Sequence, residues 1–363
     1  MSWSEHTEYA DLYRQLNAPT CSYEALCELA AQGLPDACGI RPLVWMLLLH
    51  TAPLDKTKRE ERRAEHLASY KNFVDMFTSG PIKHDKANIL QRIQNDVKRT
   101  MRINHLFASD PSHSAALIRI LFVFANLWPQ IGYVQGLNEI AGPMYYVFRN
   151  DQCKGKDSTD LIEADTFFCF MNLVSQLHFY IEDMDSSHGG IVSIMQNMSE
   201  RLRQLDPVLH RHLANLGIEP AFYSLRWITT IFTREFSLPD SCRLWDTLFT
   251  IQQADIINFI QSFCCAMLMA IRHDLLKLHH DAALQMLQDY PSTVGMEALL
   301  QLCHSIRSGT YSRIAPVQQM PTILSKIWNQ NRSETSSDFL LRSSEIMPNN
   351  KEGMKLVRQF KIQ

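Results

Sequence analysis

Residues 115–128, AALIRILFVFANLW, carry apolar side chains at three- and four-residue steps, the periodicity expected of a buried α-helix. Pro129 and Gly132 follow and end this predicted helix, and a second helical segment is predicted over 135–148. Segments with the same periodicity recur at 24–31, 40–50, 62–77, 88–101, 166–180, 191–206, 207–216, 220–232, 239–249, 256–277 and 281–288. Because few segments alternate as strands do, the sequence predicts an all-α fold.

Polar segments interrupt this helical pattern and indicate how the chain is organised. Residues 150–160 (NDQCKGKDSTD) are expected to form a surface loop within a first lobe, and residues 183–190 (DMDSSHGG) to separate that lobe from a second. Over 329–350, serine, asparagine and charged residues replace the apolar rhythm. This tail is therefore expected to be disordered, with a short helix at 352–360.

The composition narrows the class of protein. At 363 residues and 46% hydrophobic content the chain can bury a large core, and a net charge of −3 makes nucleic acid an unexpected partner. Its nine cysteines include no CxxC pair and its first residues lack an apolar signal segment, which favours reduced thiols in a cytoplasmic protein.

The most apolar stretch, 256–271, is interrupted by Asn258, Gln261 and Ser262 and is shorter than the roughly 20 apolar residues of a bilayer span. We expect a buried helix there and no transmembrane segment.

A first short pattern, IQNDVKR at 93–99, reads IxxDxxR. At about 100° per helical residue, one apolar stripe is formed by Leu90, Ile93, Val97 and Met101. Arg92, Asp96 and Arg99 fall on nearly the opposite face, so Arg99 is expected to point at solvent or at a partner. Asp96 is close enough to hold the Arg99 guanidinium by an i,i+3 contact. The alternative is a solvated face with a surface ion pair worth about 0–1 kcal/mol.

A second pattern, YxQ, follows the break and opens the run YVQGLNEI. If this segment is extended, Tyr133 and Gln135 face the same way, and Gly136 lets a foreign backbone approach. The alternative is a buried turn in which Tyr133 packs and Gln135 satisfies a helix end. Arginine and glutamine are the side chains that phosphoryl-transfer sites use to neutralise charge and to orient water. Since neither GxxxxGKS/T nor GxGxxG occurs, the two would serve a nucleotide held by another protein.

Three stretches occur in order along the chain: IQNDVKR followed by Thr100, then YVQGLNE, then FYSLRWITTIFTREFSLPDSCRLWDTLF at 222–249. Together with the opening GLPDACGIRPLVWMLLL at 33–49, they resemble the motifs of TBC domains, the GTPase-activating proteins of Rab GTPases. The likeness covers about 33–290.

The resemblance implies a two-lobed helical TBC domain with extensions at both ends. The expected parts are a helical extension at 1–32, a catalytic lobe at about 33–185, a second lobe at about 190–290, a helical extension at 291–328 and a flexible polar tail at 329–363.

The resemblance to TBC domains also implies roles for individual residues. Arg99 matches the arginine finger, and Gln135 matches the glutamine finger, which replaces the Rab's own glutamine in positioning water. Residues expected to support the fingers are Asp96, Tyr133, Ile93, Thr100 and Gly136. Residues expected to be structural, with the tryptophans in the core, are Arg41, Trp45, Arg226, Trp227, Trp245 and Asp246.

The implied partner is a GTP-bound Rab, which would hold Mg²⁺ and GTP, so no cofactor or metal is expected on this chain. Such a protein would regulate vesicle trafficking from the cytoplasm, with transient peripheral recruitment to endomembranes through its Rab. The alternative is a non-catalytic effector or scaffold that binds a Rab through a TBC fold. Intact Arg99 and Gln135 favour catalysis, because a scaffold needs neither.

Overall fold

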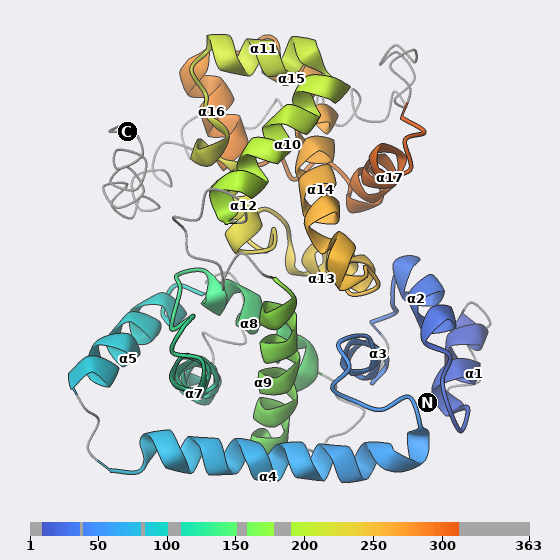
Figure 1. The fold of residues 1–363 in the computed structure, drawn as a ribbon, viewed down its shortest axis with the longest axis vertical. Coiled ribbons are helices and arrows are strands. Elements are labelled where there is room, and N and C mark those ends of the chain that lie inside the picture. Colours follow the sequence, from blue (N-terminus) through green and yellow to red (C-terminus); the bar gives the residue numbers. More distant parts are fainter. Residues whose placement is uncertain are drawn as a thin grey trace.

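The computed structural model describes residues 9–36, 39–80, 84–100, 110–150, 158–177 and 190–311. These residues form helices joined by turns and loops, and the β-type pairing found among them is an isolated bridge between Thr20 and Asp55. Figure 1 shows two helical lobes, the first drawn in blue to green and the second in yellow-green to orange. The prediction of an all-α, two-lobed fold is confirmed. The predicted tail at 329–363 lies outside the described residues.

The first lobe contains the N-terminal helices and the segments that carry both short patterns. Its elements are α1 (Ala10–Asn17), α2 (Tyr23–Ala31), α3 (Ile40–Leu48), the 3-10 turn η3 (Lys56–Lys58), α4 (Arg59–Thr78), α5 (His84–Val97), α7 (Pro111–Leu127), α8 (Leu137–Arg149) and α9 (Thr159–Gln176).

The second lobe is built around one apolar helix. Its elements are α10 (Ile191–Leu205), α11 (Pro207–Asn215), η6 (Pro220–Phe222), α12 (Ser224–Thr229), α13 (Leu238–Leu248), η7 (Gln253–Asp255), α14 (Ile256–Ala270), α15 (Arg272–Leu275), α16 (His280–Gln288) and α17 (Met296–Arg307). The α14 helix packs against α10 and α17. By length and composition the segment 253–270 could cross a bilayer, but 67% of it is buried inside the protein, as in a core helix.

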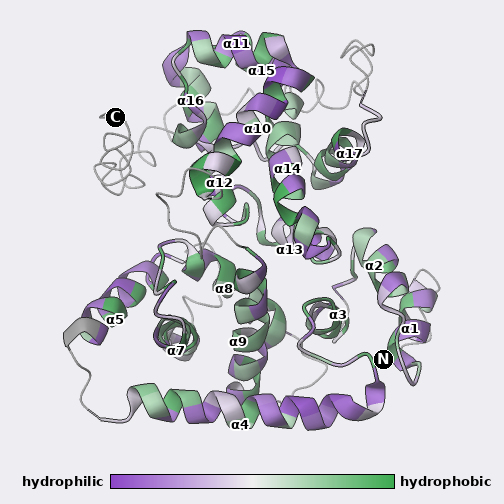
Figure 2. Cartoon of the chain, in the orientation of Figure 1, coloured by the Kyte–Doolittle hydropathy of each residue, from purple (hydrophilic) through white to green (hydrophobic). Residues whose placement is uncertain are grey.

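Buried carboxylates anchor α4, the long helix along the base of the first lobe in Figure 1. The Tyr70 hydroxyl donates to Glu163 Oε2 at 2.9 Å, and Arg119 Nε donates to the same oxygen at 3.0 Å. Arg63 Nε donates to Asp165 Oδ2 at 2.8 Å. Burial of a carboxylate is costly unless it is paired, so these contacts fix α4 on α9. Figure 2 shows that the N-terminal part of α4 is mostly hydrophilic, so this part has little apolar surface with which to pack on α9.

Two predicted helices are interrupted, each at a turn. The predicted helix 220–232 is divided into η6 and α12, and α12 stops at Thr229. The predicted helix 256–277 is divided at Ile271, the residue between α14 and α15, whose φ of −102° and ψ of 13° leave the helical region. Periodicity missed both breaks because apolar residues continue through them.

The α9 helix begins earlier than predicted. It starts at Thr159 rather than at 166, because Ser158 Oγ accepts a hydrogen bond from Leu161 N at 3.3 Å and caps the helix. The end of the predicted surface loop 150–160 is therefore helical from Thr159, and residues 151–157 lie outside the described residues.

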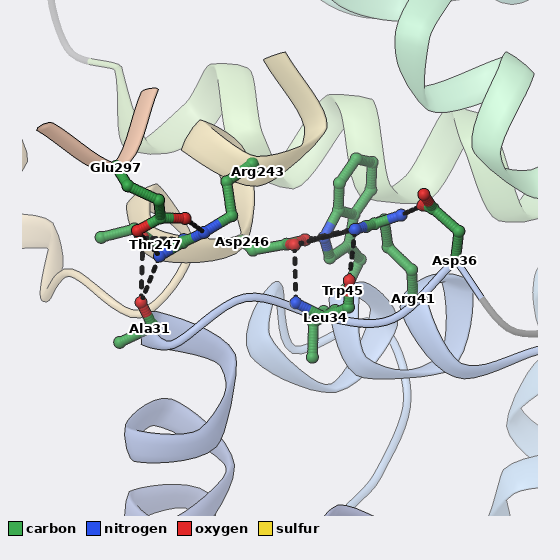
Figure 3. Close-up of polar contacts among 9 residues, drawn as sticks. All are labelled: Ala31, Leu34, Asp36, Arg41, Trp45, Arg243, Asp246, Thr247 and Glu297. Carbon is green, nitrogen blue, oxygen red and sulfur yellow. Dashed lines mark hydrogen bonds and ion pairs between the residues drawn. The ribbon is translucent and has the colours of Figure 1, made fainter. Parts of the chain in front are cut away.

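A buried carboxylate joins the two lobes, as Figure 3 shows. The Asp246 side chain on α13 is 0% exposed, and its Oδ2 accepts from Leu34 N at 2.9 Å. Trp45 Nε1 donates to Asp246 Oδ1 at 2.8 Å. Arg41 Nε donates to Oδ1 and Arg41 Nη2 to Oδ2, both at 3.1 Å. Burial raises the pKa of Asp246 above its usual value, and the Arg41 guanidinium opposes that rise. The charged form of this carboxylate therefore depends on Arg41.

A second polar contact lies beside the first in Figure 3. Arg243 Nη2 donates to the Ala31 carbonyl at 3.0 Å, and Thr247 Oγ1 donates to the same oxygen at 3.3 Å. Arg243 Nε also pairs with Glu297 Oε1 of α17 at 2.5 Å. The end of α2 is thus fixed to α13. Aromatic packing adds to these polar contacts between the lobes, since the Trp45 ring lies 5.8 Å from that of Trp245 and 5.1 Å from that of Phe249.

Candidate functional site

Arg99 lies just beyond the end of α5. The predicted helix continued to residue 101, but α5 ends at Val97, and Arg99 N donates to Asp96 O at 2.9 Å in a tighter turn. The Arg99 side chain is 41% exposed, and its Nη2 donates to Asp96 Oδ1 at 2.6 Å. The exposed, aspartate-held arginine was predicted, and its position at a helix end was not.

Asp96 itself is where the helical-face argument was wrong. We placed Asp96 on the solvent face with Arg99, whereas its side chain is only 11% exposed. The reason is a partner distant in sequence, because the Tyr133 hydroxyl donates to Asp96 Oδ2 at 2.9 Å. Ile93 and Val97 are buried as the apolar stripe predicted. Met101 lies outside the described residues.

Tyr133 and Gln135 do not face the same way, so the extended-segment prediction was wrong. Tyr133 is 5% exposed and packs in the core, while Gln135 is exposed. Leu137 N donates to Val134 O at 3.2 Å, so Gln135 and Gly136, whose φ is 109°, form a turn, and α8 starts at Leu137 rather than at 135. Gln135 thus lies in a turn at the surface, whereas Tyr133 before the turn is buried.

Gly136 contacts the chain's own second lobe. A side-chain carbon at this position would lie 3.2 Å from the carbonyl oxygen of Thr229. We expected the glycine to admit a foreign backbone, but the backbone that approaches it belongs to the end of α12. A positive φ and this close approach both favour glycine here.

Asn138 is a site residue that the sequence analysis missed. It is 4% exposed, and its Nδ2 donates to Thr100 Oγ1 at 2.8 Å. Thr100 Oγ1 in turn donates to Asp96 O at 3.1 Å. On its other side, Asn138 Oδ1 accepts from Gly136 N at 3.3 Å and lies 3.2 Å from the Tyr133 hydroxyl oxygen. Asn138 is one of two polar residues, with Glu139, in the first turn of a mostly apolar helix, and that was the available signal.

These contacts tie the two patterns into one polar network. The carboxylate of Asp96 joins Arg99 to Tyr133, and Asn138 joins the Gly136 turn to Thr100. Burial, and then the nearby Asp96 carboxylate, raise the pKa of the Tyr133 hydroxyl, which therefore stays protonated and able to donate. The network holds the Arg99 guanidinium directly through Asp96, and it fixes Tyr133 and Gly136 on either side of the exposed Gln135.

Residues 38–276 match the Rab-GTPase-TBC domain. The chain belongs to this family. It is 41% identical over 183 residues to TBC1 domain family member 13 of Homo sapiens, covering 50% of this chain and 45% of that protein. It is 29% identical over 319 residues to GTPase-activating protein gyp1 of Schizosaccharomyces pombe, covering 82% of this chain and 60% of that protein. The chain thus spans about half the length of these relatives.

Solved structures support the TBC fold. The Ypt/Rab-GAP domain of Gyp1p superposes with a TM-score of 0.74 at 22% identity, covering 82% of this chain and 95% of that one. A Chlamydomonas flagellar RabGAP TBC domain superposes with a TM-score of 0.55 at 20% identity, covering 78% and 84%. At these identities the likeness concerns the fold alone.

The third motif of the TBC domain lies in the core and at the lobe contact. Arg226 forms two hydrogen bonds of 2.7 Å to Glu235, whose side chain is 1% exposed. Trp227, Trp245 and Trp45 are each 0% exposed, as predicted. Arg41 and Asp246 form the buried ion pair between the lobes. None of these residues contacts Arg99 through a hydrogen bond or ion pair among the described contacts.

In the described ranges, no three His, Cys, Asp or Glu side chains lie together in a cluster suited to a metal ion. The described cysteines are free thiols.

Proposed function

We propose that this chain is a GTPase-activating protein for a Rab-family GTPase and supplies Arg99 and Gln135 in trans. One observation carries the proposal. The Arg99 guanidinium is exposed yet held by the buried carboxylate of Asp96, and Tyr133, which also binds that carboxylate, lies two residues before exposed Gln135. A surface arginine without such a base would lose more side-chain entropy on docking.

Arg99 would neutralise the charge that develops on the transferred phosphoryl group. Its planar guanidinium can donate to two oxygens at once, which a lysine ammonium cannot reproduce. In small GTPases a trans arginine accelerates hydrolysis by about 10³–10⁵. That acceleration equals roughly 4–7 kcal/mol of activation free energy.

Gln135 would place the attacking water. Its side-chain carbonyl can accept a hydrogen bond from the water while its amide donates to the γ-phosphate. Positioning of a nucleophile is a large part of such a barrier. Mg²⁺ and GTP would be held by the Rab, so this chain acts on a partner's nucleotide and hydrolyses none by itself.

The biological setting follows from the partner. A protein that returns a Rab to its GDP-bound state regulates vesicle trafficking. We propose that the chain is cytoplasmic and reaches endomembranes peripherally, by binding its GTP-loaded Rab.

A panel of purified Rab proteins tests this function. Each Rab is loaded with GTP, and single-turnover hydrolysis is followed with and without the full chain, beside a reaction with the chain and GTP but no Rab. We expect strong stimulation of at least one Rab and no hydrolysis without a Rab. Binding to a GTP-loaded Rab without faster hydrolysis would instead support the effector or scaffold function.

A further inference from the structure

The turn after α12 has an unusual backbone. Ile231 and Phe232 have φ angles of 46° and 65°, in the left-handed region. Among the described non-glycine residues, only His50 also has a positive φ. A β-branched residue such as isoleucine is rarely found there, because its side chain clashes with the backbone. Strain of this kind persists only where the surroundings impose it, and it clusters at functional sites.

The core of the second lobe imposes this conformation. Ile231 and Phe232 are both 0% exposed. Phe232 N donates to Trp227 O at 2.8 Å, and Trp245 Nε1 donates to Ile231 O at 3.2 Å. The Phe232 ring also meets Phe263 of α14 edge-on at 4.8 Å. The turn is therefore held rigidly from both sides.

The start of the turn lies against the loop of the first lobe that carries Gln135, residues 132–136, here called the glutamine loop. A side-chain carbon on Gly136 would lie 3.2 Å from the Thr229 carbonyl oxygen and 3.6 Å from Thr230 Cγ2. Gly136 is the residue directly after Gln135. Thr229 and Thr230, directly before the strained pair Ile231 and Phe232, thus lie against the residue that follows the exposed glutamine.

We propose that the turn at 229–232 sets the position of Gln135, with Thr230 and Ile231 as positioning residues. The inference rests on the proposed function, since it assigns a role in placing the water-orienting side chain. Thr229 and Thr230 limit how far the Gly136 turn can move toward the second lobe. Catalytic side chains must be held within fractions of an ångström by their supporting residues, so loosening the turn would lower kcat more than binding.

Two variants that each remove one methyl group test the inference with the smallest change in structure. Thr230→Ser removes the methyl group that faces Gly136 and keeps Oγ1, which donates to Arg226 O at 2.8 Å. Thr229→Ser also removes a methyl group and keeps its hydrogen bond to Leu225 O, but it leaves the carbonyl against Gly136 unchanged. We expect kcat for stimulated Rab hydrolysis to fall by about fivefold in Thr230→Ser only. Equal kcat values in the two variants would overturn the inference.

A stronger pair tests the strained residue itself. Ile231 and Ile228 are both 0% exposed, so Ile231→Ala and Ile228→Ala remove the same buried atoms. Ile231→Ala also relieves the clash of a β-branched side chain at positive φ, so its melting temperature should fall no further than that of Ile228→Ala. We expect about a tenfold loss of kcat in Ile231→Ala alone, with KM unchanged. In a Gln135→Ala background, Ile231→Ala should cause no further loss, because it acts through that residue. A loss that adds to that of Gln135→Ala would contradict the inference.

Amide hydrogen exchange separates this inference from the proposed function. Leu137 N donates to Val134 O at 3.2 Å and reports on the glutamine loop without any Rab. Its exchange should be faster in Ile231→Ala than in Ile228→Ala, and equal rates would overturn the inference. If wild type stimulates a Rab and Gln135→Ala does not, but both isoleucine variants behave alike, only the inference fails. If wild type stimulates no Rab, the proposed function fails, and exchange still decides whether the turn holds the loop.

Discussion

The Tyr133 hydroxyl donates to Asp96 Oδ2 at 2.9 Å, although 37 residues separate the two along the chain. The other oxygen of the same carboxylate accepts from Arg99 at 2.6 Å. One buried aspartate thus links the helix end that carries the arginine to the loop that carries Gln135. The link gives both exposed side chains a common, rigid base.

The tyrosine hydroxyl can be removed without changing the ring. Tyr133→Phe leaves Asp96 short of one buried donor, which should cost about 1–3 kcal/mol of unfolding free energy. Because Asp96 also holds Arg99, the stimulated hydrolysis rate should fall by about tenfold, the loss expected from roughly 1.4 kcal/mol at the transition state. Thermal melting and single-turnover hydrolysis are measured on the same samples.

Tyr145→Phe is the matched control. Tyr145 is also buried in the first lobe, and its hydroxyl is 3.1 Å from His113 Nδ1. The Tyr145→Phe variant should lose about as much stability as Tyr133→Phe and should keep its stimulation of Rab hydrolysis. Equal losses of activity in the two variants would show that the effect of Tyr133 is one of stability alone.

Two carboxylates that contact Arg41 should differ sharply in their effect on stability. Asp246→Asn leaves the Arg41 guanidinium without its buried counter-charge and should cost about 3–5 kcal/mol of unfolding free energy. Asp36 contacts the same guanidinium, but its side chain is 83% exposed. Asp36→Asn should therefore cost less than about 1 kcal/mol. Denaturant unfolding measures both values, and similar costs would contradict the assignment of Asp246 as the buried link between the lobes.

The three buried tryptophans should act on stability and not on chemistry. Trp45→Ala, Trp227→Ala and Trp245→Ala should each cost about 3–5 kcal/mol and reduce the yield of folded protein. Trp128 is only partly buried, so Trp128→Ala should cost less and serves as the control. A normal melting temperature combined with a selective loss of Rab stimulation would contradict the core role of the tryptophan concerned.

Local patterns predicted the fold class and the exposed arginine, because both depend on neighbours within one or two helical turns. The burial of Ile93 and Val97 followed from the same periodicity. The burial of Tyr133 beside the exposure of Gln135 did not, because Gln135 lies inside a turn from Val134 to Leu137, closed by the hydrogen bond from Leu137 N to Val134 O. Strand alternation does not hold where the segment is a turn rather than an extended strand.

Long-range contacts account for what the sequence could not predict. Asp96 was placed on a solvent face because its partner, Tyr133, is distant in the chain. The end of α12 at Thr229 was missed because apolar residues continue through the strained turn, whose shape is imposed by Trp245 and the core of the second lobe. Asn138 was missed because its role depends on Thr100 of another segment.

Arg99 should be essential for stimulation and dispensable for folding. Arg99→Ala should lose at least about 10³ in stimulated hydrolysis, and Arg99→Lys nearly as much, since lysine lacks the planar pair of donors. Its side chain is 41% exposed, so the melting temperature should change little. Arg92→Ala removes another exposed arginine of α5 and should keep kcat within about threefold of wild type, far from the loss of a finger. Activity of Arg99→Ala within about threefold of wild type would exclude a finger role.

The central claim, that both fingers come from this chain, is tested most directly by a two-by-two comparison. Wild-type protein and Gln135→Ala are each assayed in single-turnover hydrolysis with a wild-type Rab and with a Rab whose own switch glutamine is changed to alanine. If Gln135 places the water, the altered Rab remains a substantial substrate for wild-type protein, and Gln135→Ala loses most activity toward both Rabs. If Gln135→Ala stimulates the wild-type Rab normally while loss of the Rab glutamine abolishes stimulation, the Rab places its own water and the role of Gln135 is contradicted.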